Sequence, residues 1–105
     1  MSVQQKLEQA IARAVEAASP KQIILFGSAA TGELTENSDL DLLVVVADGA
    51  HRRQTAHEIY RNLFGLGFAV DVIVVTESDL EERRSSASSI VRPALEHGKV
   101  VYDAA

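Results

Sequence analysis

The stretch Gly27-Ser28, followed after ten residues by Asp39-Leu40-Asp41 and the apolar run 42–46, decides the fold of this chain. Side chains on a strand alternate between the two faces of a sheet, so a strand over 39–47 directs the carboxylates of Asp39 and Asp41 to one face. The preceding run, Gln22–Phe26, is β-branched and aromatic and stops at Gly27, which predicts a buried strand. The sequence therefore predicts two strands, the first ending in a glycine-serine turn and the second beginning with a pair of acids.

Length and composition restrict the class of protein. With 105 residues, 47% hydrophobic and 24% charged, we expect one compact domain spanning 1–105. The chain has no cysteine, which excludes disulfides and thiol-based metal sites. A net charge of -5 disfavours sequence-independent binding to duplex nucleic acid. No apolar run reaches the roughly 18 residues of a membrane span and no signal peptide is evident, so we expect a cytoplasmic protein without membrane contact.

The pattern of apolar, turn and capping residues predicts the other elements. An amphipathic helix is expected over 3–18, because apolar residues recur there every fourth position, and Ser19-Pro20 ends it. Ser78 and Glu81 have the spacing of a capping box, which predicts a short helix from 78. The remaining predicted elements are a helix between 49 and 65, a strand over 68–75, helical turns around 90–97 and a candidate edge strand over 100–102. This order indicates an α/β domain with helices packed on a sheet.

Asp39 and Asp41 form a candidate seat for a divalent cation. Mg²⁺ prefers oxygen ligands and usually takes one or two protein carboxylates, with substrate phosphate and water completing its shell. Two acids held side by side repel unless a cation compensates them. Asp71 is a third candidate, because it interrupts an otherwise apolar strand pattern. An Asp-x-Asp pair alone is more often a strand end facing solvent, so the interpretation depends on its neighbours in the sequence.

Gly27 and Ser28 form a candidate phosphate-binding turn. Glycine allows a positive φ and close approach of the backbone to a phosphate, and serine offers an amide and a hydroxyl to phosphate oxygens. A Gly-Ser turn alone is common, but Gly, Ser and both acids at this spacing are expected by chance on the order of once in a thousand such chains. Carboxylates beside a phosphate-binding turn predict Mg²⁺-dependent nucleotidyl transfer.

On these residues the chain resembles the minimal nucleotidyltransferases of the DNA polymerase beta superfamily. The matching segments are Leu25-Phe26-Gly27-Ser28, the spacer that ends in Asn37-Ser38, the run from Asp39 to Val44, Asp71 within its strand, and the ending 98–102. The resemblance implies the polymerase-beta-like nucleotidyltransferase fold, an α/β domain with a small mixed three-stranded sheet flanked by helices. It implies that Asp39, Asp41 and Asp71 are catalytic and hold one or two Mg²⁺ ions. It also implies that Gly27 and Ser28 bind the nucleotide and that ATP is the substrate.

The resemblance further implies a partner protein. Such small proteins are similar to the antitoxin half of toxin–antitoxin pairs, whose toxin is a helical HEPN-type ribonuclease, and some transfer AMP to a tyrosine of that partner. Where many relatives carry arginines after the Gly-Ser pair, this chain has Ala29-Ala30-Thr31. The alternative is therefore a catalytically weak binding module that neutralises its partner by forming a complex. A third interpretation is a nucleotide sensor without transfer.

The other polar aromatic residues receive no functional role from the sequence. The three histidines, at positions 51, 57 and 97, lack the spacing of a zinc motif. Tyr60 and Tyr102 are candidate modification sites, but amphipathic core or rim positions are favoured.

Overall fold

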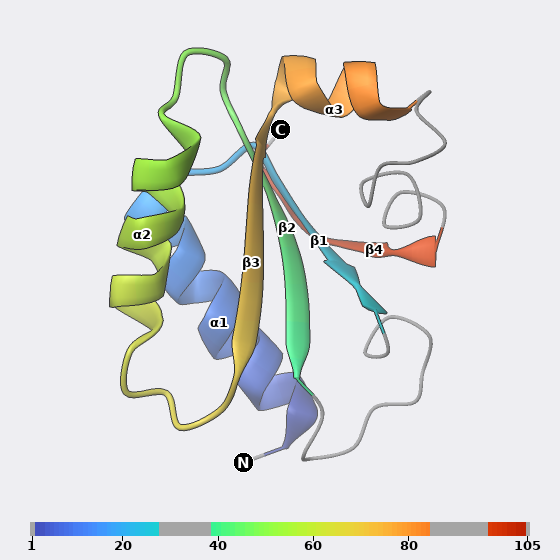
Figure 1. The fold of residues 1–105 in the computed structure, drawn as a ribbon. Helices are drawn as coiled ribbons and strands as arrows, with labels where there is room; N and C mark the ends of the chain where they lie inside the picture. Colours follow the sequence, from blue (N-terminus) through green and yellow to red (C-terminus); the bar gives the residue numbers. More distant parts are fainter. Residues whose placement is uncertain (1, 28–38, 85–96, 105) are drawn as a thin grey trace.

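The computed structural model describes residues 2–27, 39–84 and 97–104, which form three helices and four strands (Figure 1). They are α1 (Val3–Ala18), β1 (Gln22–Phe26), β2 (Leu40–Val46), α2 (Arg52–Leu63), β3 (Val70–Thr76), α3 (Glu77–Arg84) and β4 (Lys99–Asp103). This order confirms the predicted α/β class. Ser28 and, apart from residue 97, the helical turns predicted around 90–97 lie outside the described residues.

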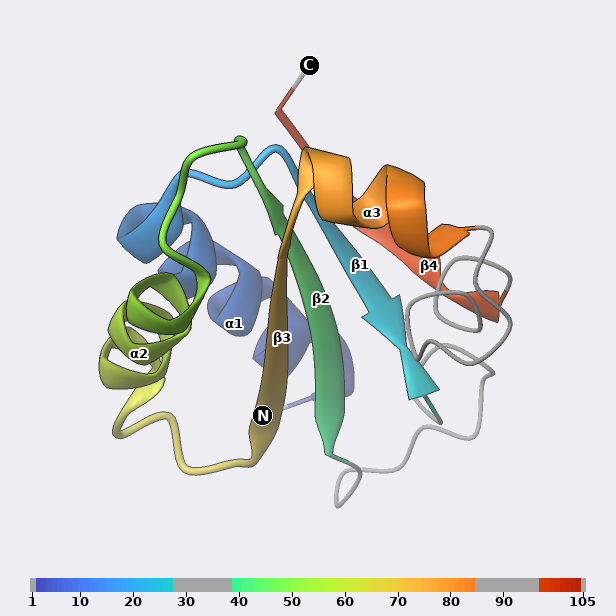
Figure 2. The same ribbon diagram turned by 45° about the horizontal axis from the view of Figure 1, so that its top comes forward.

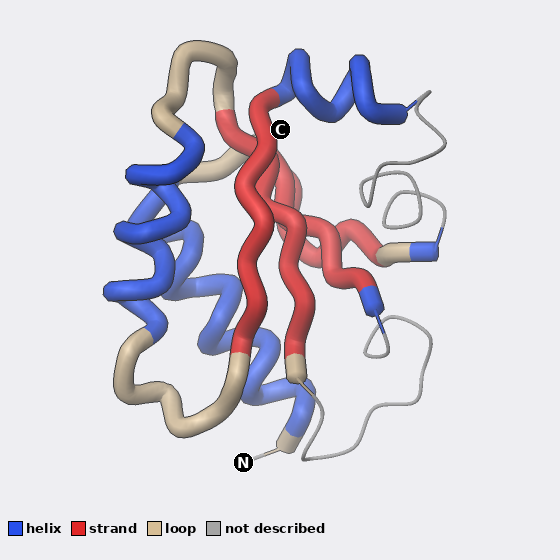
Figure 3. The backbone as a smooth tube through the Cα atoms, viewed as in Figure 1, coloured by secondary structure: helices blue, strands red, loops and turns tan. Residues whose placement is uncertain are grey.

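The strands form one mixed sheet in the order β3-β2-β1-β4, which Figure 3 shows as adjacent strand tubes. β1 pairs antiparallel with both β2 and β4, whereas β2 and β3 are parallel. Parallel neighbours need a crossover connection, and α2 supplies it. The mixed sheet is as predicted but has four strands rather than three, because the candidate edge strand near the end of the chain pairs with the free edge of β1.

Both faces of the sheet are packed, with α1 and α2 on one face and α3 over the other (Figure 2). The first core contains Leu42 and Val44 of β2 beside residues of α1 and α2, and the second contains Leu43 and Val45 beside Leu80 of α3. Because side chains alternate along a strand, a continuous apolar run is what a strand buried on both faces requires. The unbroken run 42–46 is therefore explained by the central position of β2.

Helix α1 has the predicted bounds and clear caps. The Ser2 hydroxyl accepts a hydrogen bond from the Gln5 N–H at 3.2 Å, and the Ser2 N–H donates to Gln5 Oε1 at 2.9 Å. At the other end Ser19 adopts a left-handed conformation with φ of 46°, and its N–H donates to the Val15 carbonyl. Each cap satisfies backbone groups that the helix leaves without an intrahelical partner.

The capping box predicted at Ser78 and Glu81 is wrong, because α3 begins earlier and is capped by Thr76 and Asp79. The Asp79 N–H donates to Thr76 Oγ1 at 3.1 Å, and the Thr76 N–H donates to Asp79 Oδ2 at 3.2 Å. Ser78 instead donates from its N–H and its hydroxyl to Asp48, at 2.9 and 2.5 Å, and these bonds lower the pKa of Asp48. β3 thus runs directly into α3 without a loop.

The helices that the structure describes in 2–27, 39–84 and 97–104 are too short or too polar to cross a membrane.

Candidate active site

Three of the predicted site residues, Gly27, Asp41 and Asp71, lie close together where β1 ends and β2 and β3 begin. Phe26, the last residue of β1, lies opposite Asp41 of β2 in the antiparallel pairing, and Gly27 follows directly. Asp41 lies opposite Asp71 of β3 in the parallel pairing. Neighbouring strands are about 4.8 Å apart, so this register places the two carboxylates side by side.

The acids lie on the face of the sheet opposite α1 and α2. Leu40 and Leu42, on either side of Asp41, pack in the core beneath those helices, so Asp39 and Asp41 project from the other face. Asp41 is partly buried, whereas Asp39 and Asp71 are exposed. The Leu40 N–H donates to the Ala69 carbonyl at 3.2 Å, which ties the start of β2 to the start of β3.

Asp41 is the electrostatic centre of this group. Burial, the negative charges of Asp71 and Asp39, and a hydrogen bond with the Asp71 carboxyl raise the pKa of Asp41 above its ordinary value of 3.8. Each cause disfavours the ionised form of a carboxyl group. A cation bound between Asp41 and Asp71 would relieve the repulsion and stabilise the ionised pair.

Gly27 lies directly against the Asp41 side chain. Its φ is +75°, and a Cβ atom at this position would overlap Asp41 Oδ2 and lie 3.2 Å from Asp41 Cγ. A side chain at position 27 would thus be strained by the backbone and would push the carboxylate away. In the structure, the glycine at position 27 leaves room for the Asp41 carboxylate.

The donor set fits Mg²⁺. Asp41 and Asp71 offer two carboxylates from adjacent strands. Mg²⁺ usually takes one or two protein carboxylates. Across the described segments, no three side chains of His, Cys, Asp or Glu converge on one point as a ready three-ligand site. Asp39 therefore stands beside the pair of Asp41 and Asp71, close enough for its charge to act on Asp41.

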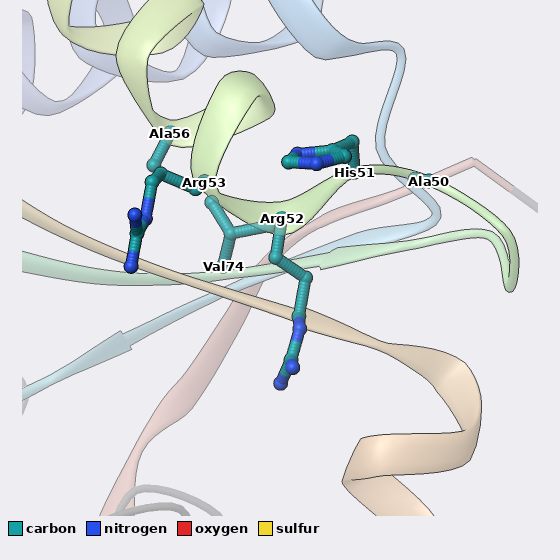
Figure 4. Close-up of a pocket in the computed structure, with 6 residues that line it drawn as sticks. All are labelled: Ala50, His51, Arg52, Arg53, Ala56 and Val74. Carbon is teal, nitrogen blue, oxygen red and sulfur yellow. The ribbon is translucent and has the colours of Figure 1, made fainter.

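An open cavity of about 660 Å³ lies elsewhere, between the start of α2 and β3. Figure 4 shows the Arg52 and Arg53 side chains extending from the start of α2, with Val74 of β3 nearby. Arg52 forms an ion pair with Asp79 at 3.0 Å. Val74 packs toward the first core, on the face opposite the acids, so this cavity is not part of the carboxylate site.

One residue beside the site had no predicted role. The Tyr60 hydroxyl, on α2, accepts a hydrogen bond from the N–H of Val72, the residue after Asp71, at 2.8 Å. The rim position expected for Tyr60 is present, since 44% of its surface is exposed. The partner of its hydroxyl is set by how α2 docks on β3, and no local spacing in the sequence signals it.

A mixed sheet with acids on adjacent strands beside a glycine turn is the arrangement of a nucleotidyltransferase. The chain belongs to the nucleotidyltransferase domain family, whose model matches residues 5–101. The resemblance drawn from the sequence is thereby confirmed.

Two proteins of Methanocaldococcus jannaschii are similar in sequence. One, named "Putative protein adenylyltransferase MJ1305", is 34% identical over 86 residues, a match covering 77% of this chain and 57% of the relative. The other, "Putative protein adenylyltransferase MJ0604", is 35% identical over 82 residues, covering 78% of each chain. The match thus spans little more than half the length of the first relative.

Solved structures share the fold. A crystal structure described as a "putative nucleotidyltransferase" from Sulfolobus solfataricus matches with a TM-score of 0.63 and 18% identity over 95% of this chain and 79% of that one, which supports the fold alone. A toxin–antitoxin structure with AMP-PNP matches with a TM-score of 0.58 and 27% identity, over 91% of this chain and 73% of that one. A mutant of the toxin–antitoxin pair MntA-HpeT matches with a TM-score of 0.56 and 26% identity, over 91% and 72%.

Proposed function

We propose that this protein is a Mg²⁺-dependent protein adenylyltransferase that moves AMP from ATP to a hydroxyl group of a partner protein in the cytoplasm. The observation that carries the proposal is the register of β2 and β3, which places Asp41 and Asp71 side by side next to Gly27. In this role Asp41 and Asp71 hold Mg²⁺, Asp39 adds a third carboxylate beside them, and Gly27 with Ser28 holds the phosphates.

The proposed reaction forms one phosphorus–oxygen bond and breaks another. The acceptor hydroxyl oxygen attacks the α-phosphorus of ATP, its proton passes to the Asp71 carboxylate, and pyrophosphate leaves with the electrons of the broken bond. Asp71 suits this role because it is exposed on the open face of the sheet, whereas Asp41 is partly buried. Mg²⁺, when bound, supplies positive charge that stabilises the phosphate oxygens.

The proposed partner is a toxin of the helical HEPN ribonuclease type, which this chain would neutralise as an antitoxin. Two structural neighbours are toxin–antitoxin structures, and one of them contains AMP-PNP, an ATP analogue. The two relatives from Methanocaldococcus jannaschii carry names that specify AMP transfer to protein. The described segments form a small, sheet-centred fold, so a protein acceptor would have to bring its own folded surface to the exposed Asp71.

A second candidate function is neutralisation by binding alone. The stretch Ala29-Ala30-Thr31 offers no cation next to the Gly-Ser turn, and this sequence feature favours a weak catalyst. In this case the fold and the partner are the same, but neutralisation of the partner does not depend on Asp39, Asp41 and Asp71.

Phosphate labelling separates these functions. The tagged protein is purified from its native host with its bound proteins and incubated with Mg²⁺ and ATP labelled on either the α- or the γ-phosphate. We expect label from the α-phosphate alone to enter a co-purifying protein, and Asp39→Asn with Asp41→Asn to abolish it. Glu16→Gln, an exposed acid on α1, serves as the matched control and retains transfer.

Three outcomes of this experiment are decisive. Equal labelling by the parent and the double variant would contradict the role of the acids. Absence of labelling by the parent, with the bound protein retained by both forms, would favour the binding module. Labelling from the γ-phosphate would indicate a kinase instead.

A further inference from the structure

The Asp71 carboxylate sits on a strand that β2 supports from one side only. Among the strands that the structure describes, β3 lies at the edge of the sheet, and Asp71 lies near its start, opposite Asp41. The like charges of these acids favour separation, and an edge strand has no second neighbour to resist it. The pairing with β2 sets the register of the two carboxylates, and a contact on the outer edge of β3 would restrain Asp71 further.

The Tyr60 side chain contacts β3 at this point from its outer edge. Its hydroxyl accepts from the Val72 N–H at 2.8 Å and donates to the Val72 carbonyl at 3.4 Å. The Val72 N–H belongs to the peptide group that directly follows Asp71, so the shorter bond restrains the peptide plane attached to the Asp71 Cα. Tyr60 thus bonds to β3 at one residue, on the edge that pairs with no other described strand.

The helix that carries Tyr60 is itself firmly docked. Ile59, the preceding residue, is completely buried in the core between α2 and the sheet. Asn62 and Arg13 exchange two hydrogen bonds, from Asn62 Nδ2 to the Arg13 carbonyl at 2.8 Å and from Arg13 to the Asn62 carbonyl at 3.0 Å, which join α2 to α1. Because α2 is held in place, the hydroxyl of Tyr60 restrains the position of the β3 backbone to which it is bonded.

We propose that Tyr60 is a positioning residue for the carboxylate site: its hydroxyl, bonded to both backbone polar groups of Val72, holds Asp71 beside Asp41 so that the pair binds a divalent cation. This inference rests on the proposed function, since it takes the acids to be metal ligands. Tyr60 itself lies on the α2 face of the sheet and does not contact the cation or the substrate.

Mn²⁺ alone is the probe, because it accepts the same oxygen ligands as Mg²⁺ and its free form is measured by electron paramagnetic resonance. Tyr60→Phe removes the hydroxyl and keeps the ring, so the packing of α2 is retained. We expect it to weaken Mn²⁺ binding about three- to ten-fold, the range spanned by the loss of one neutral hydrogen bond. Tyr102→Phe is the matched control, since it removes the same atom from β4 at the opposite edge of the sheet, and it should change the affinity less than about twofold.

Tyr60→Phe is then made in an Asp71→Asn background. If Tyr60 had a purely structural role, the substitution would weaken Mn²⁺ binding by the same factor in this background as in the parent. If Tyr60 acts through Asp71, Tyr60→Phe weakens Mn²⁺ binding less than about twofold there. The inference would be overturned if Tyr60→Phe still weakened Mn²⁺ binding three- to ten-fold in this background. It would also be overturned if Tyr60→Phe and Tyr102→Phe changed the Mn²⁺ affinity of the parent equally. If Asp71→Asn alone leaves Mn²⁺ affinity unchanged, Asp71 is no metal ligand, and the metal site of the proposed function fails together with this inference.

Discussion

Gly27→Ala tests the close contact between the end of β1 and Asp41. An alanine at a left-handed φ of +75° costs about 1–2 kcal/mol of stability from backbone strain. Its Cβ would in addition overlap Asp41 Oδ2, and overpacking of this kind costs about 1–3 kcal/mol. We therefore expect Gly27→Ala to lower the free energy of unfolding by about 2–5 kcal/mol, against a total stability of roughly 5–15 kcal/mol for an ordinary domain.

Gly49→Ala is the control for the strain alone. Gly49 has a φ of +93°, but no atom lies within 4 Å of where its Cβ would be. Its substitution should cost only the backbone term of about 1–2 kcal/mol. The difference between the two variants, measured by urea unfolding, isolates the collision with the Asp41 carboxylate.

A third variant shows whether the collision is with Asp41 itself. In an Asp41→Ala background the overlapping oxygen and Cγ are gone, and only the Cβ of residue 41, at 3.5 Å, remains near position 27. Gly27→Ala should then cost no more than Gly49→Ala. The reasoning is refuted if Gly27→Ala and Gly49→Ala are equally destabilising in the parent.

Four further outcomes are expected. Asp41→Asn should stabilise the ligand-free protein at pH 7 by a few tenths to about 1 kcal/mol, because the pKa of Asp41 is raised in the folded state, where its ionised form is disfavoured. When unfolding is measured across pH, this gain in stability should vanish below pH 3.8, the ordinary pKa, and should grow as the pH rises through the raised pKa. Asp39→Asn with Asp41→Asn should abolish the increase in melting temperature that MgATP gives the parent, and equal increases in both would rule out the metal seat. Ser28→Ala should weaken ATP binding about ten- to a hundred-fold in calorimetric titration, as expected for a lost hydrogen bond to a charged phosphate, and an unchanged affinity would remove Ser28 from the site. Asp71→Asn should keep most of the MgATP affinity while losing AMP transfer to the partner, and transfer at the parent rate would contradict its role in readying the acceptor.

Much of the architecture follows from local patterns in the sequence. The bounds of α1 and β1 were predicted to the residue, because apolar periodicity, Ser19-Pro20 and Gly27 are signals that act within a few residues. The α3 cap was mispredicted because Thr76 and Asp79 compete with Ser78 and Glu81 for the same role, and Asp48, thirty residues away, engages Ser78 instead. The fourth strand also depends on long-range pairing, because residues 99–103 form a strand through hydrogen bonds to β1, which lies far away in the sequence.

By itself, the sequence determined local features: a glycine directly after the first strand and, through the two-residue period of the next, an acid that projects from the face opposite Leu40 and Leu42. That information is local, because covalent geometry alone makes the side chains of a strand alternate. Only the tertiary structure decided that Asp71 lies opposite Asp41, that Gly27 leaves room for the Asp41 carboxylate, and that Tyr60 bonds to the peptide after Asp71. These contacts depend on strand register and on how α2 docks, which are set by burial of the whole core.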